Sequence, residues 1–142
     1  MIMKRILYLI GLVAVISCPL AINAQTYNTY KELPEVKIDY TVQQCGAEPN
    51  VISEMNFIRL TNKTTREISV SFKIEYYYNG VCTTCNTGEY FVTYKIAANQ
   101  SITTDCDNLG GGYGNLGIIK RYVNRNFGHP LDRFELTNIS VQ

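Results

Sequence analysis

The feature that most constrains this sequence is a long alternation of apolar and polar side chains between Ile68 and Tyr78. The apolar set is Ile68, Val70, Phe72, Ile74, Tyr76 and Tyr78, and the intervening set is Ser69, Ser71, Lys73, Glu75 and Tyr77. Successive side chains of a β-strand point to opposite faces, so a period of two predicts a strand with one face on the core. We therefore expect an all-β fold.

Shorter segments of similar character flank this strand. We expect strands at Val36–Val42, Met55–Leu60, Glu89–Ile96, Ser101–Cys106, Leu116–Val123 and Phe134–Val141. Polar turns such as Asn79-Gly80 separate the strands, and this dipeptide tolerates the positive φ of tight turns. About seven short strands joined by turns predict an antiparallel β-sandwich of the immunoglobulin or fibronectin III type.

Two of these segments contain irregularities. In the last predicted strand Leu136 and Ile139 fall on opposite phases of the alternation, which predicts a β-bulge near Asn138. The apolar residues of segment 116–127 fit helical spacing as well as strand spacing, so a helix stays open there as the alternative.

The first residues have the three parts of a secretory signal peptide. Lys4 and Arg5 form a basic start, an apolar run extends from Ile6 to Ile16, and Ala24 supplies a small residue for cleavage. The run is shorter than the roughly 20 residues of a membrane-spanning helix. We expect residues 1–24 to be removed, leaving a mature chain without a transmembrane segment.

A second cleavage site competes with Ala24. Val15-Ile16-Ser17-Cys18 is similar to a bacterial lipobox, in which Cys18 would carry lipid at the mature N-terminus. Lipid chains anchor a protein because each buried methylene contributes about 0.8 kcal/mol. We favour cleavage after Ala24, because Pro19 and Ala24 fit an ordinary signal peptide. A lipoprotein anchored through Cys18 is the alternative.

Length and charge limit the number of domains and the kinds of ligand that we expect for the exported chain. Loss of residues 1–24 from the 142-residue chain leaves 118 residues, a length typical of one domain. We expect residues 25–34 to be a flexible N-terminal segment and residues 35–142 to form the sandwich. The 13 Lys and Arg face 12 Asp and Glu, and loss of Lys4 and Arg5 leaves a net charge of −1. Nucleic-acid binding needs a concentrated basic face, so we expect none.

Four cysteines remain after cleavage: Cys45, Cys82, Cys85 and Cys106. An even number in an exported chain indicates disulfides, because the compartment is oxidising. Four cysteines permit three connectivities. We favour Cys82 with Cys85 across a tight turn, and Cys45 with Cys106 around a long loop. Chain entropy assigns about 4 kcal/mol to the long loop and about 2 kcal/mol to the short one.

The Cys82-Thr83-Thr84-Cys85 motif also has a functional interpretation, in redox or metal chemistry. In redox enzymes the first cysteine of such a motif lies at a helix N-terminus, whereas here the motif connects two predicted strands. A four-cysteine zinc site generally has two such motifs, and Cys45 and Cys106 stand apart. Thiol–disulfide exchange or metal handling by Cys82 and Cys85 is therefore the alternative to a structural disulfide.

Other motifs indicate no catalytic centre. Gly112–Gly117 matches the spacing of a dinucleotide fingerprint, but that fingerprint needs a βαβ unit, which the surrounding sequence does not predict. His129 is the only histidine, and no nucleophile elbow accompanies it. We expect no cofactor, no bound metal and no enzymatic activity.

Four residues form our candidate binding surface: Tyr77, Phe91, Lys120 and Arg121. Tyr77 points away from the core face and Phe91 is expected near it, and exposed aromatics on a sheet can hold a sugar ring or a protein. Lys120 and Arg121 begin a mild basic cluster that could meet anionic sugars or lipid head groups. The structural alternatives are aromatics that cover a sheet face and a charged strand face that discourages edge pairing.

Several short motifs can be considered together: Asn23-Ala24-Gln25, Leu60-Thr61-Asn62, Tyr76-Tyr77-Tyr78, Cys82-Thr83-Thr84-Cys85 and the closing 134–139, with Cys45 and Cys106. This arrangement resembles small secreted immunoglobulin-like β-sandwich proteins of Bacteroidota-type bacteria. The resemblance covers most of the mature chain. It implies export and a sandwich fold, and it implies no activity.

These features together predict an exported, non-enzymatic β-sandwich module that is periplasmic, on the cell surface or secreted. We expect it to have a binding or structural role with a protein or glycan partner at the cell envelope. Sandwich folds host unrelated functions, so this expectation rests on fold-level analogy. The alternative function is a periplasmic thiol–disulfide or metal-handling protein that uses Cys82 and Cys85.

Overall fold

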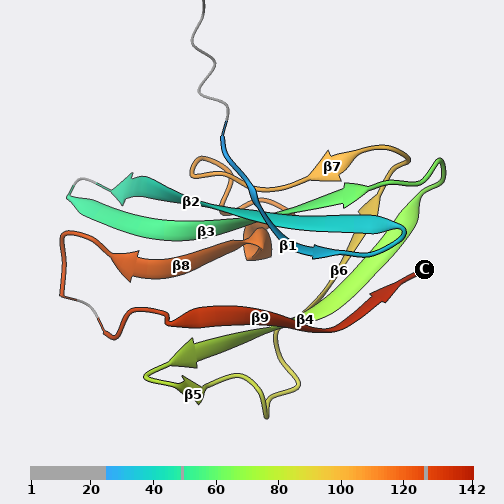
Figure 1. Cartoon of the computed structure of the whole chain (residues 1–142). Coiled ribbons are helices and arrows are strands. Elements are labelled where there is room, and N and C mark those ends of the chain that lie inside the picture. The colour runs from blue at the N-terminus through green and yellow to red at the C-terminus, as the bar shows by residue number, and fades with distance from the viewer. Residues whose placement is uncertain (1–24, 49, 127) are drawn as a thin grey trace, which may run out of the picture.

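The computed structural model describes residues 25–142 except residues 49 and 127 (Figure 1). The strands in this part are β1 (Asn28–Glu32), β2 (Val36–Glu48), β3 (Val51–Asn62), β4 (Ile68–Tyr78), β5 (Val81–Cys82), β6 (Phe91–Ile96), β7 (Ser101–Ile102), β8 (Gly117–Tyr122) and β9 (Arg133–Val141). One 3-10 helix, η1 (Gly114–Leu116), precedes β8. The all-β prediction is confirmed. The predicted signal peptide, including Cys18 and Ala24, lies outside the described residues.

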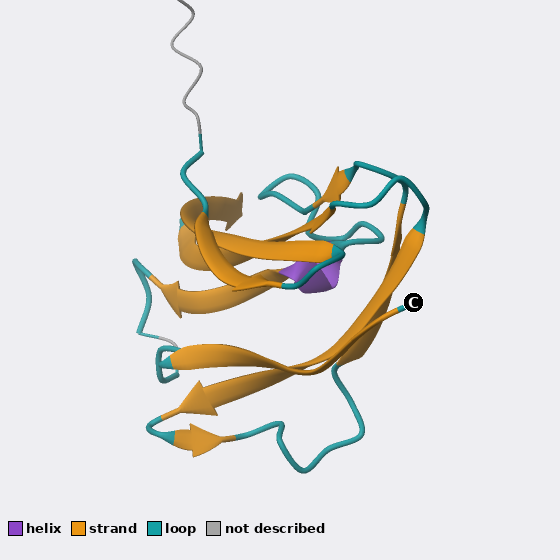
Figure 2. Cartoon of the chain, turned by 45° about the vertical axis from the view of Figure 1, so that its right-hand side comes forward, coloured by secondary structure: helices purple, strands orange, loops and turns teal. Residues whose placement is uncertain are grey.

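The strands form two antiparallel sheets that face each other (Figure 1). Sheet A has the order β1-β2-β3-β7, with β8 also paired to β3. Sheet B has the order β5-β4-β6, with β9 also paired to β4. The long strands of sheet A bend, and the sheet curls into half a barrel (Figure 2). Two facing antiparallel sheets give a sandwich-like architecture.

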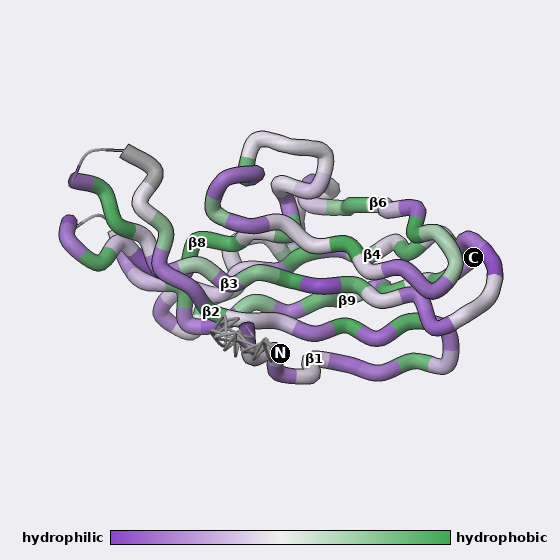
Figure 3. The backbone as a smooth tube through the Cα atoms, turned by 90° about the horizontal axis from the view of Figure 1, so that it is seen from above, coloured by the Kyte–Doolittle hydropathy of each residue, from purple (hydrophilic) through white to green (hydrophobic). Residues whose placement is uncertain are grey.

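The main core lies between the two sheets. Ile68, Val70, Phe72 and Ile74 of β4 are all at most 1% exposed, as the alternation predicted. They pack against side chains of sheet A that include Ile38, Ile58 and Leu60. Figure 3 shows apolar and polar residues alternating along these strands. Burial of one such side chain contributes about 1.5–3 kcal/mol, so this shared interior holds the sheets together.

A second, smaller core lies on the outer face of sheet A. Cys45, Met55 and Phe57 are buried there, and Cys106 and Leu109 pack against them. The disulfide between Cys45 and Cys106 joins β2 to the loop that follows β7. This loop therefore covers apolar side chains that would otherwise face water.

Part of the segment 25–34, which the sequence predicted to be flexible, forms the strand β1. Tyr30 stacks on Phe134, with ring centroids 5.6 Å apart, and its hydroxyl accepts a hydrogen bond from the Leu136 amide at 2.8 Å. On β2, Asp39 accepts a hydrogen bond from the Thr29 hydroxyl at 3.2 Å. Because two of these partners are about a hundred positions away in the chain, local sequence gives little indication of them.

The number of strands and the ends of several strands also differ from the prediction. The structure has nine strands in its described residues, where the sequence predicted about seven. The segment from Gly117 to Tyr122 is the strand β8, so the helical alternative is wrong there. The predicted strand Ser101–Cys106 is shorter, because the Thr103 hydroxyl donates to the Ile58 carbonyl and the chain then leaves the sheet.

The bulge predicted near Asn138 is confirmed. Asn138 has φ 53°, and the register between β4 and β9 shifts between Ser71 and Lys73. Asparagine tolerates this left-handed conformation better than most residues. The extra residue brings Leu136 and Ile139 to the same apolar interior despite their opposite phases.

The buried tyrosines give a prediction for alkaline pH. Burial raises the pKa of Tyr76 and of Tyr94 from 10.0 to about 12. We expect both phenols to ionise after the exposed ones in a spectrophotometric titration of the folded protein. Each pKa is raised by folding, so the associated stability is complete below pH 10 and is lost as pH rises towards 12.

The control for this titration is Tyr94→Phe. Among the described residues nothing hydrogen-bonds the buried Tyr94 hydroxyl, so its removal should leave the melting temperature unchanged or higher. One late-ionising phenol should disappear in this variant. Ionisation of every tyrosine in a single step near pH 10 would contradict the prediction.

Candidate functional site

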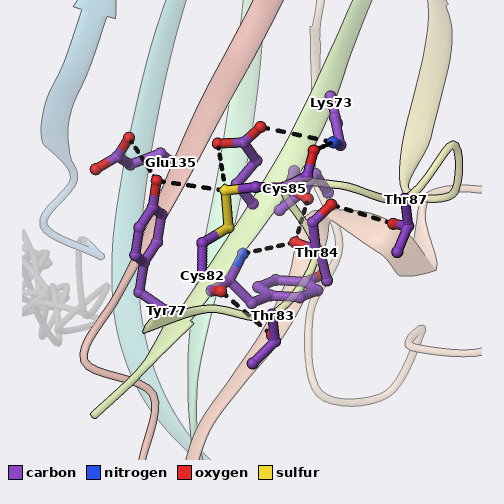
Figure 4. Close-up of polar contacts among 11 residues, drawn as sticks. Lys73, Tyr77, Cys82, Thr83, Thr84, Cys85, Thr87 and Glu135 are labelled. Carbon is purple, nitrogen blue, oxygen red and sulfur yellow. Dashed lines mark hydrogen bonds and ion pairs between the residues drawn. A yellow bond between two sulfur atoms is a disulfide. The ribbon is translucent and has the colours of Figure 1, made fainter. Parts of the chain in front are cut away.

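The Cys82–Cys85 disulfide closes a turn that folds back along the edge of β4 (Figure 4). β5 pairs with the end of β4, whereas β6 pairs with its beginning. Between them the Thr84 hydroxyl accepts a hydrogen bond from the Tyr76 amide at 2.9 Å and donates to the Ile74 carbonyl at 3.3 Å. Thr84 thus replaces the strand partner that this stretch of β4 lacks. Both cysteine pairs in the structure are the pairings favoured from the sequence.

A buried charge pair lies under the disulfide turn. Lys73 is 4% exposed, and its ammonium lies 3.6 Å from a Glu75 carboxylate oxygen and donates to the Cys85 carbonyl. The other Glu75 oxygen lies 3.2 Å from the Cys85 sulfur. A buried ammonium is costly without such partners. The turn therefore provides a hydrogen-bond acceptor for the Lys73 ammonium and hydrogen-bond partners for the backbone at the edge of β4.

Tyr77 is covered by its neighbours. The Arg133 guanidinium stacks over the Tyr77 ring at 3.7 Å from the centroid. The Tyr77 hydroxyl donates to Glu135 at 3.4 Å and lies 3.6 Å from the Cys85 sulfur (Figure 4). Burial raises the pKa of Tyr77, and the Glu135 carboxylate raises it further. One face of the ring is therefore occupied, and Tyr77 does not form the open platform that the sequence suggested.

The other predicted surface residues lie elsewhere. Phe91 is 55% exposed on β6, opposite Lys73 rather than Tyr77. Lys120 and Arg121 lie on β8 of sheet A, where both bind Glu54, at 2.6 Å and 2.9 Å. Hydrogen bonds from Lys120 and Arg121 lower the pKa of Glu54. The four predicted residues thus occupy two different sheets and do not form one surface.

One group of residues has the chemistry of a metal site. Glu75, Cys82 and Cys85 each offer a ligand atom, and these atoms lie within 4.8 Å of one another. The disulfide is closed, and thiolates rather than disulfide sulfurs bind metals. Structural zinc takes four ligands, whereas this group supplies three. The group could hold a cation only after reduction.

The glycine-rich loop has a structural role. A Cβ atom at Gly114 would lie 2.2 Å from the Leu109 carbonyl oxygen, so only glycine permits this close backbone approach. The approach forms the η1 turn that buries Leu116 completely. Its surroundings are strands and loops rather than a βαβ unit, and the dinucleotide spacing is coincidental. His129 lies exposed in the loop before β9.

A cleft that the sequence did not predict lies between the two sheets near β8 and β9. Its lining includes Tyr30, Tyr40, Val42, Asn56, Lys120 and Phe134. We call it the inter-sheet cleft, and it encloses about 290 Å³. Ligand pockets are typically about 300–1,000 Å³, so the cleft is at the small end of that range.

Aromatic rings form the apolar walls of the inter-sheet cleft. Tyr30 stacks on Phe134, whereas Tyr40 stands edge-on to Phe134, with centroids 5.9 Å apart and an interplanar angle of 84°. All three rings are half-buried, so each keeps an accessible part. Val42 adds an aliphatic side chain that is 41% exposed. The rings form a corner rather than a flat floor.

Asn56 is the polar residue at the base of the inter-sheet cleft. It is 6% exposed, and no described residue hydrogen-bonds its side-chain amide. The amide therefore faces the space of the cleft, where a ligand can reach it. Sequence carried one indication, because Asn56 has the same strand phase as Ile58 and Leu60, both of which are in the core.

These features define an all-β protein of two facing antiparallel sheets with two disulfides, one between β2 and the loop after β7 and one in the turn after β5. Comparisons of the chain with protein-family models, with curated proteins and with solved structures find no match. Within the described residues no helix is long and apolar enough to cross a membrane.

Proposed function

We propose that this chain is an exported, non-enzymatic module of the immunoglobulin or fibronectin III type that binds a cell-envelope partner through the inter-sheet cleft. The observation that carries the proposal is the cleft itself, with three half-buried aromatic rings around the unpartnered amide of Asn56. Small-molecule and glycan sites combine apolar walls with a few placed polar groups. Strands hold these side chains more rigidly than a loop would.

Export is supported by the two disulfides, because they persist in oxidising compartments and are rare in the cytosol. The proposed mature protein begins at Gln25 and is periplasmic, on the cell surface or secreted. A lipid-modified Cys18 is the alternative N-terminus. The intact mass of native protein distinguishes a chain that starts at Gln25 from one that starts at lipidated Cys18.

The test of binding uses one variant in the cleft and one outside it. Val42→Arg places a charge in the inter-sheet cleft, and Val81→Arg makes the same change on β5, where Val81 is 64% exposed. Wild-type protein and Val81→Arg should bind the same component of isolated envelope fractions, and Val42→Arg should not bind it. Equal retention by all three proteins would refute a role for the cleft.

A second candidate function uses Cys82 and Cys85, supported by the 3.2 Å contact between Glu75 and the Cys85 sulfur. In this alternative the protein exchanges disulfides or handles metal in the periplasm. Thiol titration and metal analysis of native protein separate the two functions. Two closed disulfides and no metal favour the binding module, whereas free Cys82 and Cys85 with stoichiometric zinc or copper favour the alternative.

A further inference from the structure

We propose that the inter-sheet cleft binds a neutral sugar ring, with an apolar face of the ring against Tyr40 and Phe134 and a hydroxyl bonded to the amide of Asn56. The inference rests on the proposed function, since it names the ligand class of the same cleft. Three properties of the cleft lead to it: the arrangement of its rings, its free amide and its balanced charges.

The rings suit a ligand that has both apolar and polar edges. Tyr40 stands at 84° to Phe134, so their accessible parts meet at a corner that can contact a small ring from two sides. A sugar ring has C–H groups on its faces and hydroxyls around its rim. Its faces can lie against aromatic side chains while its rim reaches polar groups.

The amide of Asn56 matches a hydroxyl group. A side-chain amide offers two donors and an acceptor, and a hydroxyl both donates and accepts. No described residue hydrogen-bonds these groups, and Asn56, which is 6% exposed, lines the cleft. A sugar hydroxyl in the cleft would supply a hydrogen-bond partner that the protein itself does not provide.

The charges at the cleft favour a neutral ligand. Lys120 is bound by Glu54 at 2.6 Å, and Arg133 donates to Glu135 at 2.8 Å. Asp132 accepts a hydrogen bond from the Gly80 amide at 2.7 Å. An anionic ligand would have to displace Glu54 or Glu135 from these cations.

The test is calorimetric titration of the purified, disulfide-bonded mature protein with glucose, galactose, mannose, N-acetylglucosamine and their short oligomers. At least one sugar should bind, and Asn56→Leu should weaken its affinity at least tenfold. The same variant should unfold at a temperature close to that of the wild type, because the Asn56 amide makes no hydrogen bond within the protein. A merely structural role for Asn56 would instead lower the unfolding temperature.

Two further variants keep the test decisive. Asn86→Leu makes the same change at an exposed position just after the disulfide turn and should bind as wild type does. Tyr40→Leu keeps apolar bulk without the ring and should also weaken binding, which covers the case that Asn56→Leu fails to fold. Absence of sugar binding, binding of uronic acids or peptides alone, or unchanged affinity in both cleft variants would overturn the inference. If sugars fail while envelope material still distinguishes Val42→Arg from Val81→Arg, only the ligand class is wrong.

Discussion

Replacing Cys45 and Cys106 together with serine is expected to lower the free energy of unfolding by about 4 kcal/mol. The bridge joins residues 61 positions apart, and the entropy gained by an unfolded chain grows with the length of the loop that a disulfide closes. Small domains are typically stable by only about 5–15 kcal/mol, so this loss is a large fraction of the total. Denaturant unfolding of the double variant and wild type measures it.

The matched control is the double variant Cys82→Ser with Cys85→Ser. This bridge spans 3 positions, and the same reasoning gives a loss of about 2 kcal/mol. The Cys45–Cys106 variant should also become sensitive to proteolysis around Leu109, because the loop that covers Met55 and Phe57 is no longer tied to β2. A larger loss in the control than in the Cys45–Cys106 variant would contradict the prediction.

Features that depend on neighbouring residues were predictable from the sequence. The alternation from Ile68 to Tyr78 gave β4 and its buried face, since strand geometry alone decides which side chains share a face. The phase change around Asn138 gave the bulge for the same reason. Export chemistry and loop length led to the two cysteine pairings that the structure contains.

Features that depend on distant residues were not predictable. Sequence periodicity shows that Tyr77 faces outwards, but it does not show that Arg133 stacks on its ring. It likewise does not show that β1 pairs with β2 and brings Tyr30 to Phe134. The inter-sheet cleft is formed by five strands and the segment leading into β9, so no short stretch of sequence contains its pattern.

Polar residues at core positions were the indication that the sequence analysis overlooked. Asn56 and Asn62 share a phase with Ile58 and Leu60, and all four are at most 6% exposed. Buried polar groups are nearly always hydrogen-bonded or functional. Asn62 has partners and is structural, whereas Asn56 lacks them and lines the inter-sheet cleft. Only the fold separates the two cases.

Asn62 connects the two sheets at the end of β3. Its amide group donates to the carbonyls of Arg66, Ile96 and Ala97 at 2.7, 3.0 and 3.1 Å. Its carbonyl accepts hydrogen bonds from the amide and the hydroxyl of Thr64, both at 2.8 Å. One side chain thus supplies hydrogen-bond partners for backbone groups at the end of β6 in sheet B and in the turn that leads into β4.

Asn62→Leu is therefore expected to lower the free energy of unfolding by about 3 kcal/mol. An unsatisfied buried carbonyl at Ile96 costs about 1–3 kcal/mol, and the lost hydrogen bonds to Thr64 add about 1 kcal/mol. Denaturant unfolding measures the loss, and Asn86→Leu at an exposed position should change stability by less than about 0.5 kcal/mol. A loss in Asn62→Leu no larger than in Asn86→Leu would contradict this role.

The variant Asn62→Asp tests the same contacts through their dependence on pH. An aspartate here would face the carbonyl oxygens of Ile96 and Ala97 in a buried site, and both burial and these oxygens disfavour its charge. Its folded pKa should therefore rise above the usual value of about 3.9. A raised pKa gives stability that is present at low pH and lost as pH rises through it. The loss of stability of Asn62→Asp relative to wild type should thus be larger at pH 7 than at pH 4. A loss that does not change with pH would show that these carbonyls do not depend on hydrogen bonds from the Asn62 amide.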